Sequence, residues 1–372
     1  METKSVKRVF EKLLDSTDVT LNGESPWDIK VHNPQFYQRT LNQGALGLGE
    51  SYMEGWWDCQ KIDVFIDKIL RANLGDKIKK SKLLMLKMFF LKFLNYQTKK
   101  HSLEVAEKHY DLSNELFQAM LDSRMNYTCG YWKEAKTLEE AQRAKLKLTC
   151  DKLLLKPGMR LLDIGCGWGG FAKFAAENYG VSVVGVTISK EQCHYAQKVC
   201  EGLPIDIRFQ DYRDIQEKFD RIVSLGMFEH VGHRNYATYM KVVSHCLVDD
   251  GLFVLHTIGD NVTEVPNEWI TKYIFPHGML PSAQLIGKAI EGLFVMEDWH
   301  NFGTDYDKTL MSWHENFEKA WPTLKSQYDE RFYRMWNYYL LSCAGNFRAR
   351  SVQLWQIVLS KNGLAGGYQA PR

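Results

Sequence analysis

The stretch Leu161-Leu162-Asp163-Ile164-Gly165-Cys166-Gly167-Trp168-Gly169-Gly170 decides the fold of this 372-residue chain. Its first residues predict a buried strand, the glycines predict a tight turn, and residues 171–178 predict a helix. Gly165 and Gly167 remove side chains where the backbone must approach a ligand closely or adopt a positive φ angle. The carboxylate of Asp163, two residues before the first glycine, could meet an ammonium group of a bound cofactor.

The glycine pattern alone leaves more than one kind of cofactor open. Gly170 follows Gly167 by three residues, which also satisfies the G-x-G-x-x-G spacing of dinucleotide-binding turns. A nicotinamide or flavin cofactor is therefore an alternative on the local pattern. No G-K-[ST] follows the turn, which argues against a P-loop.

Strand and helix patterns alternate on both sides of this turn. The first strand is expected at residues 159–164, a second strand at 181–188, and a helix at 190–200. Further strand candidates lie at residues 205–209, 221–225, 252–257, 294–299 and 352–360. This alternation predicts an α/β fold with a mainly parallel sheet covered by helices on both faces.

The N-terminal region has a different pattern. Residues 5–74 are predicted to form short helices and to make a small, mainly helical domain. The glycine-rich turns between these helices are expected at Gly44, Gly47, Gly49 and Gly55. Both halves of the fold class, the α/β part and the helical part, are thus predicted from local patterns.

Residues 77–100 combine many lysines with leucine, methionine and phenylalanine, and no acid lies between Asp76 and Glu104. A helix that is both cationic and apolar suits an anionic membrane surface. The alternative is a core helix whose lysines extend to the solvent. This segment is also predicted to join the small domain to the rest of the chain.

Composition narrows the class of protein. The formal charge of +2 is near neutral, which argues against nucleic acid as a partner. The eight cysteines form no C-x-x-C pair, so the sequence predicts neither a metal site nor a disulfide framework. No run reaches the roughly 20 apolar residues that a spanning helix needs. The aromatic content of 13% fits either a large core or an aromatic-lined ligand site.

The second strand end departs from the common cofactor pattern. In dinucleotide-binding proteins an acid at this place binds the ribose hydroxyls, but here Thr187 and Ser189 follow the strand, with Gln192 one turn later. Ser189 could equally be an ordinary helix cap. The missing acid disfavours the nicotinamide alternative.

The glycine-rich segment closely resembles the first motif of class I S-adenosylmethionine methyltransferases. The resemblance implies a Rossmann-like sheet and S-adenosylmethionine as cofactor, with Asp211 and Tyr212 bordering the adenine. The residues expected to bind the cofactor are Tyr127, Thr128, Asp163, Gly165, Gly167, Gly169, Thr187, Ser189, Gln192, Asp211 and Tyr212.

Further motifs resemble those of one family, the cyclopropane-fatty-acyl-phospholipid synthases. They lie at residues 109–112, 126–132, 226–232, 256–259, 272–276, 297–306 and 343–348. The resemblance covers residues 28–360 and includes residues 46–57, for which the shorter mycolic-acid synthases have no equivalent. Thr128 and Gly130 stand where the family usually has Ser and Ala.

The resemblance implies transfer of a methylene group from S-adenosylmethionine to the cis double bond of unsaturated acyl chains in membrane phospholipids. Methyl transfer to an alkene leaves a carbocation, which aromatic faces such as those of Tyr131, Trp132 and Phe302 can stabilise. Bound bicarbonate then removes a proton so that the ring closes. The catalytic residues carried over by motif are Cys129, Glu229, His256, Ile258, Tyr306 and Cys343.

These residues do not carry equal weight. Backbone N–H groups of Cys129 and Ile258 could bind the oxygens of the anion, and His256 and Tyr306 could donate further hydrogen bonds to it. Glu229 could accept a hydrogen bond from the bicarbonate hydroxyl and so orient the base. Cys343 carries less weight, because a cysteine among small and apolar neighbours usually serves packing.

Two other functions stay open at this point. The reaction could stop at a methyl-branched or methylene-bearing acyl chain, or the chain could be a non-catalytic lipid binder with a degenerate site.

By resemblance, the enzyme is expected to be a cytoplasmic homodimer that is peripheral on the inner membrane leaflet. The expected domains are a lipid-interaction domain at residues 1–76, a cationic amphipathic linker at 77–103 and the methyltransferase domain at 104–372.

Overall fold

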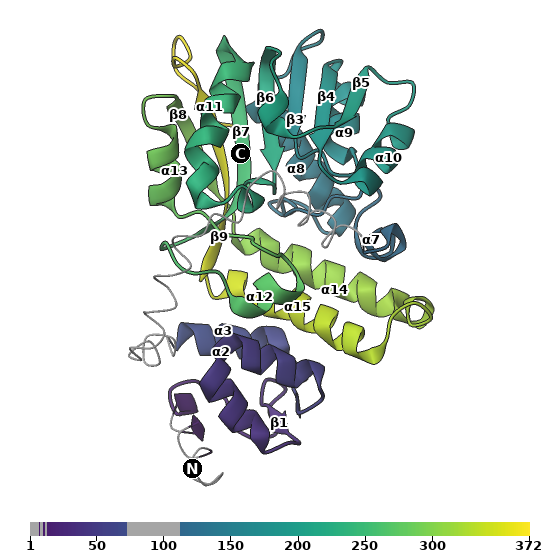
Figure 1. Ribbon diagram of the computed structural model, residues 1–372, viewed down its shortest axis with the longest axis vertical. Helices are drawn as coiled ribbons and strands as arrows, with labels where there is room; N and C mark the ends of the chain where they lie inside the picture. The colour runs from purple at the N-terminus through teal and green to yellow at the C-terminus, as the bar shows by residue number, and fades with distance from the viewer. Residues whose placement is uncertain (1–6, 8–9, 12, 73–111) are drawn as a thin grey trace. The chain divides into compact units, whose positions relative to one another are not determined.

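The computed structural model describes residues 7, 10–11, 13–72 and 112–372 (Figure 1). The predicted cationic segment at residues 77–103 lies outside the described residues. The chain divides into two compact units. Among the described residues, one unit comprises 112–264, 277–309 and 353–372 and is called here the sheet unit. The other comprises the described residues up to 72, with 265–276 and 310–352, and is called the helical unit.

The sheet unit is built around one seven-stranded sheet. Its strands are β3 (Arg160–Ile164), β4 (Ser182–Thr187), β5 (Ile205–Phe209), β6 (Phe219–Leu225), β7 (Leu247–Asp260), β8 (Val295–Asn301) and β9 (Val352–Ser360). The strand order is β5-β4-β3-β6-β7-β9-β8. The strands from β5 to β7 pair in parallel, and β8 pairs antiparallel to β9. Every predicted strand is confirmed, and so is the mainly parallel sheet.

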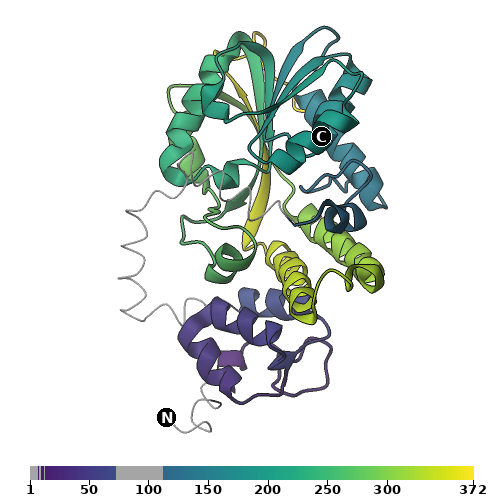
Figure 2. The same cartoon turned by 45° about the vertical axis from the view of Figure 1, so that its right-hand side comes forward.

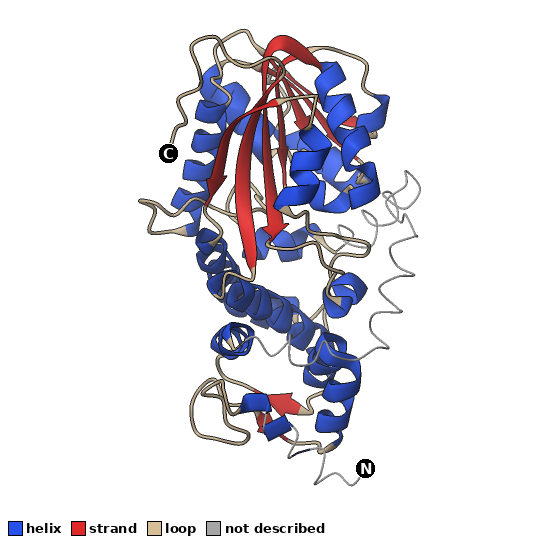
Figure 3. Cartoon of the chain, turned by 90° about the vertical axis from the view of Figure 1, so that its left-hand side faces the viewer, coloured by secondary structure: helices blue, strands red, loops and turns tan. Residues whose placement is uncertain are grey.

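Helices cover both faces of this sheet, as Figure 3 shows with the helices in blue and the strands in red. They are α8 (Leu138–Lys152), α9 (Gly170–Tyr179), α10 (Lys190–Val199), α11 (Tyr236–Cys246) and α13 (Ala283–Ile290). The sheet unit also contains the short helix α7 (Asn114–Met120). Neighbouring residues of β3 point to opposite faces, because side chains alternate along a strand. Leu161 packs into the core with α8, α9 and α10, while Leu162 packs into the core with α11 and α13.

The glycine-rich turn connects β3 to α9. Gly165 and Gly167 have φ angles of 82° and 54°, in the left-handed region that favours glycine. The backbone N–H groups of Gly165 and Cys166 donate to the carbonyl of Val186 on the neighbouring strand, at 2.9 and 3.0 Å. A Cβ at Gly170 would lie 2.3 Å from the carbonyl oxygen of Arg124. Gly170 therefore allows the backbone of Arg124 to pack closely against the turn. This packing accounts for a glycine at the third position of the G-x-G-x-x-G spacing, so the spacing does not require a bound dinucleotide.

The helical unit has its own core. It contains β1 (Lys30–Val31), α2 (Gln35–Met53), β2 (Trp57–Asp58), α3 (Ile62–Arg71), α12 (Glu268–Tyr273) and α15 (Glu330–Arg348). The helix α14 (Thr304–Leu324) crosses from the sheet unit into this unit. Helices α2 and α3 both pack against α15, and the views in Figures 1 and 2 agree.

The helical unit is larger than the predicted N-terminal domain. Buried carboxylates of the N-terminal region find their partners in later segments: Glu50 accepts hydrogen bonds from Lys272 Nζ and Tyr273 Oη at 2.6 and 2.7 Å. Arg348 donates to Asp63 at 2.6 Å. The short N-terminal helices thus complete their core with distant parts of the chain.

The predicted glycine-rich turns are only partly found. Gly55 does follow the end of α2, and Gly44 interrupts α2 with a φ angle of 54°. Gly47 and Gly49, in contrast, lie inside α2, so the turn prediction is wrong there. A Cβ at Gly49 would lie 2.4 Å from the ring of Trp269. This glycine is needed for close helix packing and not for a turn.

Candidate active site

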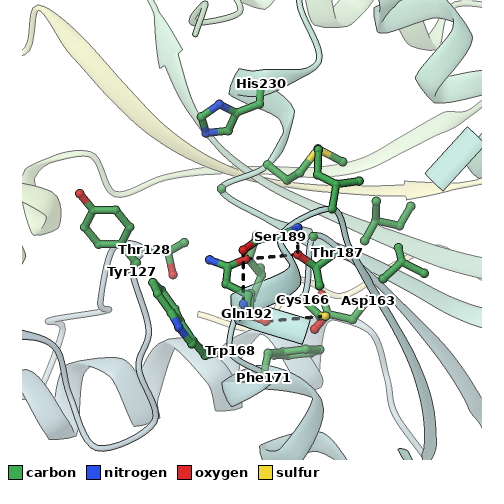
Figure 4. A pocket seen from close by; sticks show the side chains of 18 of the residues that line it. Tyr127, Thr128, Asp163, Cys166, Trp168, Phe171, Thr187, Ser189, Gln192 and His230 are labelled. Carbon is green, nitrogen blue, oxygen red and sulfur yellow. Dashed lines mark hydrogen bonds between the residues drawn. The ribbon is translucent and has the colours of Figure 1, made fainter. Parts of the chain in front are cut away.

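A cavity opens where the carboxyl ends of β3, β4, β5 and β6 meet, the edge at which open α/β sheets bind ligands. The segment at residues 125–128 closes another side of this cavity, which Figure 4 shows. Its lining includes ten of the predicted cofactor residues: Tyr127, Thr128, Asp163, Gly165, Gly167, Thr187, Ser189, Gln192, Asp211 and Tyr212. We call it the donor cavity.

Gly169, the eleventh predicted residue, does not line the donor cavity. It is the N-cap of α9 with a φ angle of 82°, and a Cβ there would lie 3.1 Å from Cys200 Sγ and 3.2 Å from Ala196 Cβ. Its lack of a side chain serves the packing of α9 against α10. The motif spacing could not separate this role from ligand binding.

Thr187, Ser189 and Gln192 form one hydrogen-bonded group at the end of β4. Ser189 Oγ accepts from the backbone N–H of Gln192 at 3.3 Å and caps α10. Thr187 Oγ1 donates to Gln192 Oε1 at 3.2 Å and accepts from the Ser189 N–H at 3.2 Å. The cap and the cavity lining therefore coincide in the same residues. These hydroxyl and amide groups occupy the place where dinucleotide binders have an acid.

Asp163 is the buried acid of the donor cavity. Only 1% of its surface is exposed, and Oδ2 has no hydrogen-bond partner among the residues that the structure describes. Burial raises the pKa of its carboxyl to about 7, although the nearby ammonium of Lys145 opposes this shift. An unpaired buried acceptor of this kind is rare in folded proteins and fits a cationic ligand group.

Glu229 follows the end of β6, and His256 lies on the adjacent strand β7, paired with Leu225 at the end of β6. Glu229 Oε1 accepts from the Ile258 N–H at 2.7 Å, and the His256 carbonyl accepts from the Gly226 N–H at 2.9 Å. These bonds join the segment after β6 to β7, and they occupy the Ile258 N–H, which is expected from the sequence to bind an anion. Burial raises the pKa of Glu229 to about 7 and lowers the pKa of His256 well below its usual value.

Each of these two side chains keeps one buried polar atom without a partner within the described part of the chain. The atoms are Glu229 Oε2, an acceptor when ionised, and His256 Nε2. Glu229 is 7% exposed and His256 is 1% exposed, so bulk water does not compensate them. The arrangement suits a small ligand that both donates and accepts hydrogen bonds.

Cys129 is completely buried, and its thiol is a poor nucleophile because desolvation and the charge of Asp305 raise its pKa. The start of α14 holds the backbone around it. Thr309 Oγ1 accepts from the Gly130 N–H at 3.1 Å and from Trp132 Nε1 at 2.9 Å. Asp305 accepts from the Trp132 N–H at 2.7 Å. These bonds fix the backbone that follows Cys129.

Aromatic rings surround this region within the sheet unit. Phe302 packs edge-on against Tyr131 and His256, with ring centroids 5.3 and 5.9 Å apart. Tyr306 is buried on the first turn of α14. Trp132 is held by its indole N–H, as described above. The structure thus gathers five of the six predicted catalytic residues in one unit.

Cys343 is the exception. It lies on α15 in the helical unit, whereas the other five predicted catalytic residues belong to the sheet unit. Desolvation raises the pKa of its thiol to about 12. A thiol with this pKa is not an active nucleophile at neutral pH.

Helix α8 carries functional candidates that the sequence motifs did not single out. Gln142, Lys145, Thr149 and Lys152 have no exposed surface and share one face of the helix. We call them the buried polar stripe. The signal was available in the sequence as polar residues at helical spacing, but solvent-facing stripes have the same spacing.

The stripe holds the segment that closes the donor cavity. Lys145 Nζ donates to Asn126 Oδ1 and to Thr128 Oγ1, each at 3.0 Å. Gln142 Nε2 donates to the Thr128 carbonyl at 2.7 Å. Burial lowers the pKa of Lys145 to about 8. Lys152 Nζ lies 3.1 Å from His300 Nδ1, further along the same helix.

Comparison with known proteins shows the family to which the chain belongs. The family model for mycolic acid cyclopropane synthetase matches residues 97–357. The chain is 54% identical over 366 residues to the cyclopropane-fatty-acyl-phospholipid synthase of Escherichia coli strain K12, covering 98% of this chain and 96% of that protein. It is 35% identical over 380 residues to a probable fatty acid methyltransferase of Pseudomonas putida, covering 97% and 93% of the two chains.

A solved structure has a similar fold. The mycolic acid cyclopropane synthase CmaA1, complexed with SAH and CTAB, has a TM-score of 0.66 at 32% identity. The match covers 70% of this chain and 98% of CmaA1. The chain therefore belongs to the cyclopropane-fatty-acyl-phospholipid synthase family and is an enzyme of the S-adenosylmethionine-dependent methyltransferase class.

Proposed function

We propose that this enzyme transfers a methylene group from S-adenosylmethionine to the cis double bond of unsaturated acyl chains in membrane phospholipids, with bound bicarbonate as the base. The donor supplies an electrophilic methyl group on a sulfonium. The donor cavity has features that suit it: Asp163 offers an unpaired carboxylate oxygen to the ammonium, and Gly165 and Gly167 allow close backbone approach. Lys145 and Gln142 hold the segment opposite these glycines.

One observation carries the choice of bicarbonate. Glu229 Oε2 and His256 Nε2 are both buried without a partner among the described residues, and more than nine-tenths of such atoms are normally paired. Bicarbonate has an O–H group that can donate to Glu229 and oxygen atoms that can accept from His256. An anion at this place also offsets positive charge that develops on the acyl chain.

The proposed reaction has two steps, methyl transfer and ring closure. The alkene carbon forms a bond to the methyl carbon while the bond from methyl carbon to sulfur breaks, which leaves a cation on the second alkene carbon. A proton then passes from the new methyl group to bicarbonate. The electron pair of the broken C–H bond closes the three-membered ring. Glu229 orients the base, and the faces of Tyr131 and Phe302 stabilise the cation while they exclude water.

Expression in a bacterium that lacks the activity tests this function. Monounsaturated fatty acids of its phospholipids should gain the mass of one methylene, and gas chromatography should identify a ring. Folded protein without this mass gain would contradict the proposal. A methyl-branched product would support the second candidate, which the name of the Pseudomonas putida relative favours.

If turnover does not depend on bicarbonate, the assignment of bicarbonate as the base is contradicted, but the methylene transfer is not. Turnover of the purified enzyme on vesicles should fall in carbonate-free buffer and return with added bicarbonate. Glu229→Gln should stay inactive at every bicarbonate concentration and still bind S-adenosylhomocysteine. Wild-type turnover by this variant would remove Glu229 from the mechanism.

We also propose that residues 77–103 contact the anionic inner leaflet from the cytoplasmic side, and that residues 1–76 interact with lipid. No helix of the described residues is long and apolar enough to span a bilayer. Replacing Lys79, Lys80, Lys82 and Lys87 by Glu should weaken binding to anionic vesicles, most of all at low salt. The matched control replaces Lys133, Lys136, Lys198 and Lys241, which are exposed in the sheet unit, by Glu. Equal binding by both variants would contradict the membrane contact.

A homodimer is proposed as the working form. Sedimentation velocity should give twice the mass of the chain at assay concentrations. A monomer with full activity would contradict this proposal.

A further inference from the structure

A buried chain of hydrogen bonds leads from helix α8 to the ring of His256. Thr149 Oγ1 donates to the Lys145 carbonyl at 2.8 Å. Gln356 Nε2, on β9, lies 3.0 Å from Thr149 Oγ1 and 3.2 Å from His256 Nδ1. Thr149 and Gln356 have no exposed surface, so water does not compete for these bonds.

The donor and the acceptor of each of these hydrogen bonds can be assigned, beginning with the hydroxyl of Thr149. A threonine hydroxyl has a single proton, and Thr149 gives it to the carbonyl four residues earlier in its helix. Its oxygen can therefore only accept from Gln356. This requires the amide nitrogen of Gln356 to face Thr149, since the amide oxygen would place two acceptors together.

The orientation of Gln356 then decides the tautomer of His256. The same amide nitrogen donates to His256 Nδ1, so Nδ1 carries no proton. The ring is neutral because burial and the nearby charges of Lys145 and Lys152 lower its pKa. The single ring proton therefore sits on Nε2, the buried nitrogen that has no partner among the described residues.

We propose that Gln356 is a positioning residue, which together with Thr149 locks His256 as the Nε2–H tautomer so that this nitrogen donates to the anionic base. This inference rests on the proposed function for the identity of the anion. The tautomer follows from the hydrogen bonds alone. Without the lock, an Nδ1–H ring would present a lone pair to an anion and repel it.

The buried amide of Gln356 destabilises the fold through one unpaired atom, which supports a functional role for this residue. Gln356 Oε1 is buried and has no hydrogen-bond partner within the described ranges. Leaving such a group unpaired costs about 1–3 kcal/mol. A nonpolar residue would avoid this cost at a purely structural position in a strand core.

Gln356→Met tests the role of the amide. Methionine has a similar length and no hydrogen-bonding group, so Nδ1 loses its donor and the ring becomes free to exchange tautomers. The turnover number should fall about 10- to 100-fold, with the KM for S-adenosylmethionine changed less than about twofold. The matched control is Gln353→Met, since Gln353 is also buried on β9 but donates to Asn261. This control should retain wild-type turnover.

Nitrogen-15 NMR of histidine-labelled protein measures the tautomer directly. The His256 signals, assigned by their loss in His256→Gln, should show the Nε2–H form in the wild type and a mixture in Gln356→Met. Wild-type protein in the Nδ1–H form would overturn the inference. So would wild-type turnover by Gln356→Met.

Thr149 provides a second route if Gln356→Met does not fold. Thr149→Val removes the hydroxyl that orients the amide and should reduce turnover, whereas Thr149→Ser keeps the hydroxyl and should restore it. Equal turnover by these two variants would contradict the proposal that Thr149 orients Gln356 and thereby fixes the tautomer of His256.

The two proposals can fail separately. If turnover does not depend on bicarbonate but the tautomer responds to Gln356→Met, the base assignment fails and the lock remains. If bicarbonate dependence holds while Gln356→Met turns over normally, the lock fails and the base assignment remains.

Discussion

Glu229→Gln should make the protein more stable at alkaline pH while it removes activity. Glu229 is buried, and its pKa is raised from the ordinary 4.5 to about 7 because burial disfavours the charged carboxylate. The variant keeps the bond from the Ile258 N–H, since the amide oxygen can replace Oε1. It removes only the charge that the fold must desolvate.

The magnitude follows from the two pKa values. The native state holds the Glu229 proton more tightly than the unfolded state, so wild-type stability falls as pH rises through the window from about 4.5 to about 7. One pKa unit corresponds to about 1.4 kcal/mol, so the full effect is on the order of 3 kcal/mol. Glu229→Gln lacks this proton, so the loss should be absent.

Urea unfolding of both proteins at about pH 5 and about pH 8 measures this difference. The stability of Glu229→Gln relative to wild type should rise by about 2–3 kcal/mol between the two conditions. Glu217→Gln is a control of opposite sign, because Arg208 and Arg160 lower the pKa of Glu217 to about 2. That variant should be less stable than wild type at neutral pH and should approach it as pH falls. A pH-independent difference for Glu229→Gln would refute the burial argument.

Four further outcomes are expected. Lys145→Met should weaken S-adenosylhomocysteine binding about 10-fold in calorimetry, because two hydrogen bonds to the cavity wall are lost, while exposed Lys147→Met should not. Gly49→Ala should lower the free energy of unfolding by about 1–3 kcal/mol through a clash with a tryptophan ring. Gly287→Ala has open space in helix α13 and should raise that free energy by about 0.5–1 kcal/mol. Cys343→Ser should turn over within about threefold of wild type, because its thiol is not ionised at neutral pH; a loss of 100-fold would restore a catalytic role.

The alternating pattern after residue 158 was enough to predict every strand of the large sheet. Buried parallel strands are short runs of apolar and β-branched residues, and helices have their own period, so both can be recognised locally. The strand ends also indicated the edge of the sheet at which the cavity with Asp163 opens and at which Glu229 bonds to β7, because parallel strands direct their carboxyl ends to one edge.

Glycine roles could not be separated by spacing. Gly165 and Gly167 have positive φ angles in the predicted turn, whereas Gly49 and Gly170 are required by a distant ring and a distant carbonyl. Gly169 faces helix α10 and not the cavity. A missing side chain looks the same in a sequence whether it serves a turn, a ligand or packing.

The sequence by itself determined the sheet, the glycine turn and the chemical types of the site residues, because these depend on neighbours within a few positions. Only the tertiary structure decided which polar groups lack partners. Lys145, Thr149 and Gln356 are ordinary polar residues in the sequence, and their roles arise from bonds across 17 to 207 positions of chain. Burial and hydrogen-bond satisfaction are properties of the whole packed unit, so no local pattern contains them.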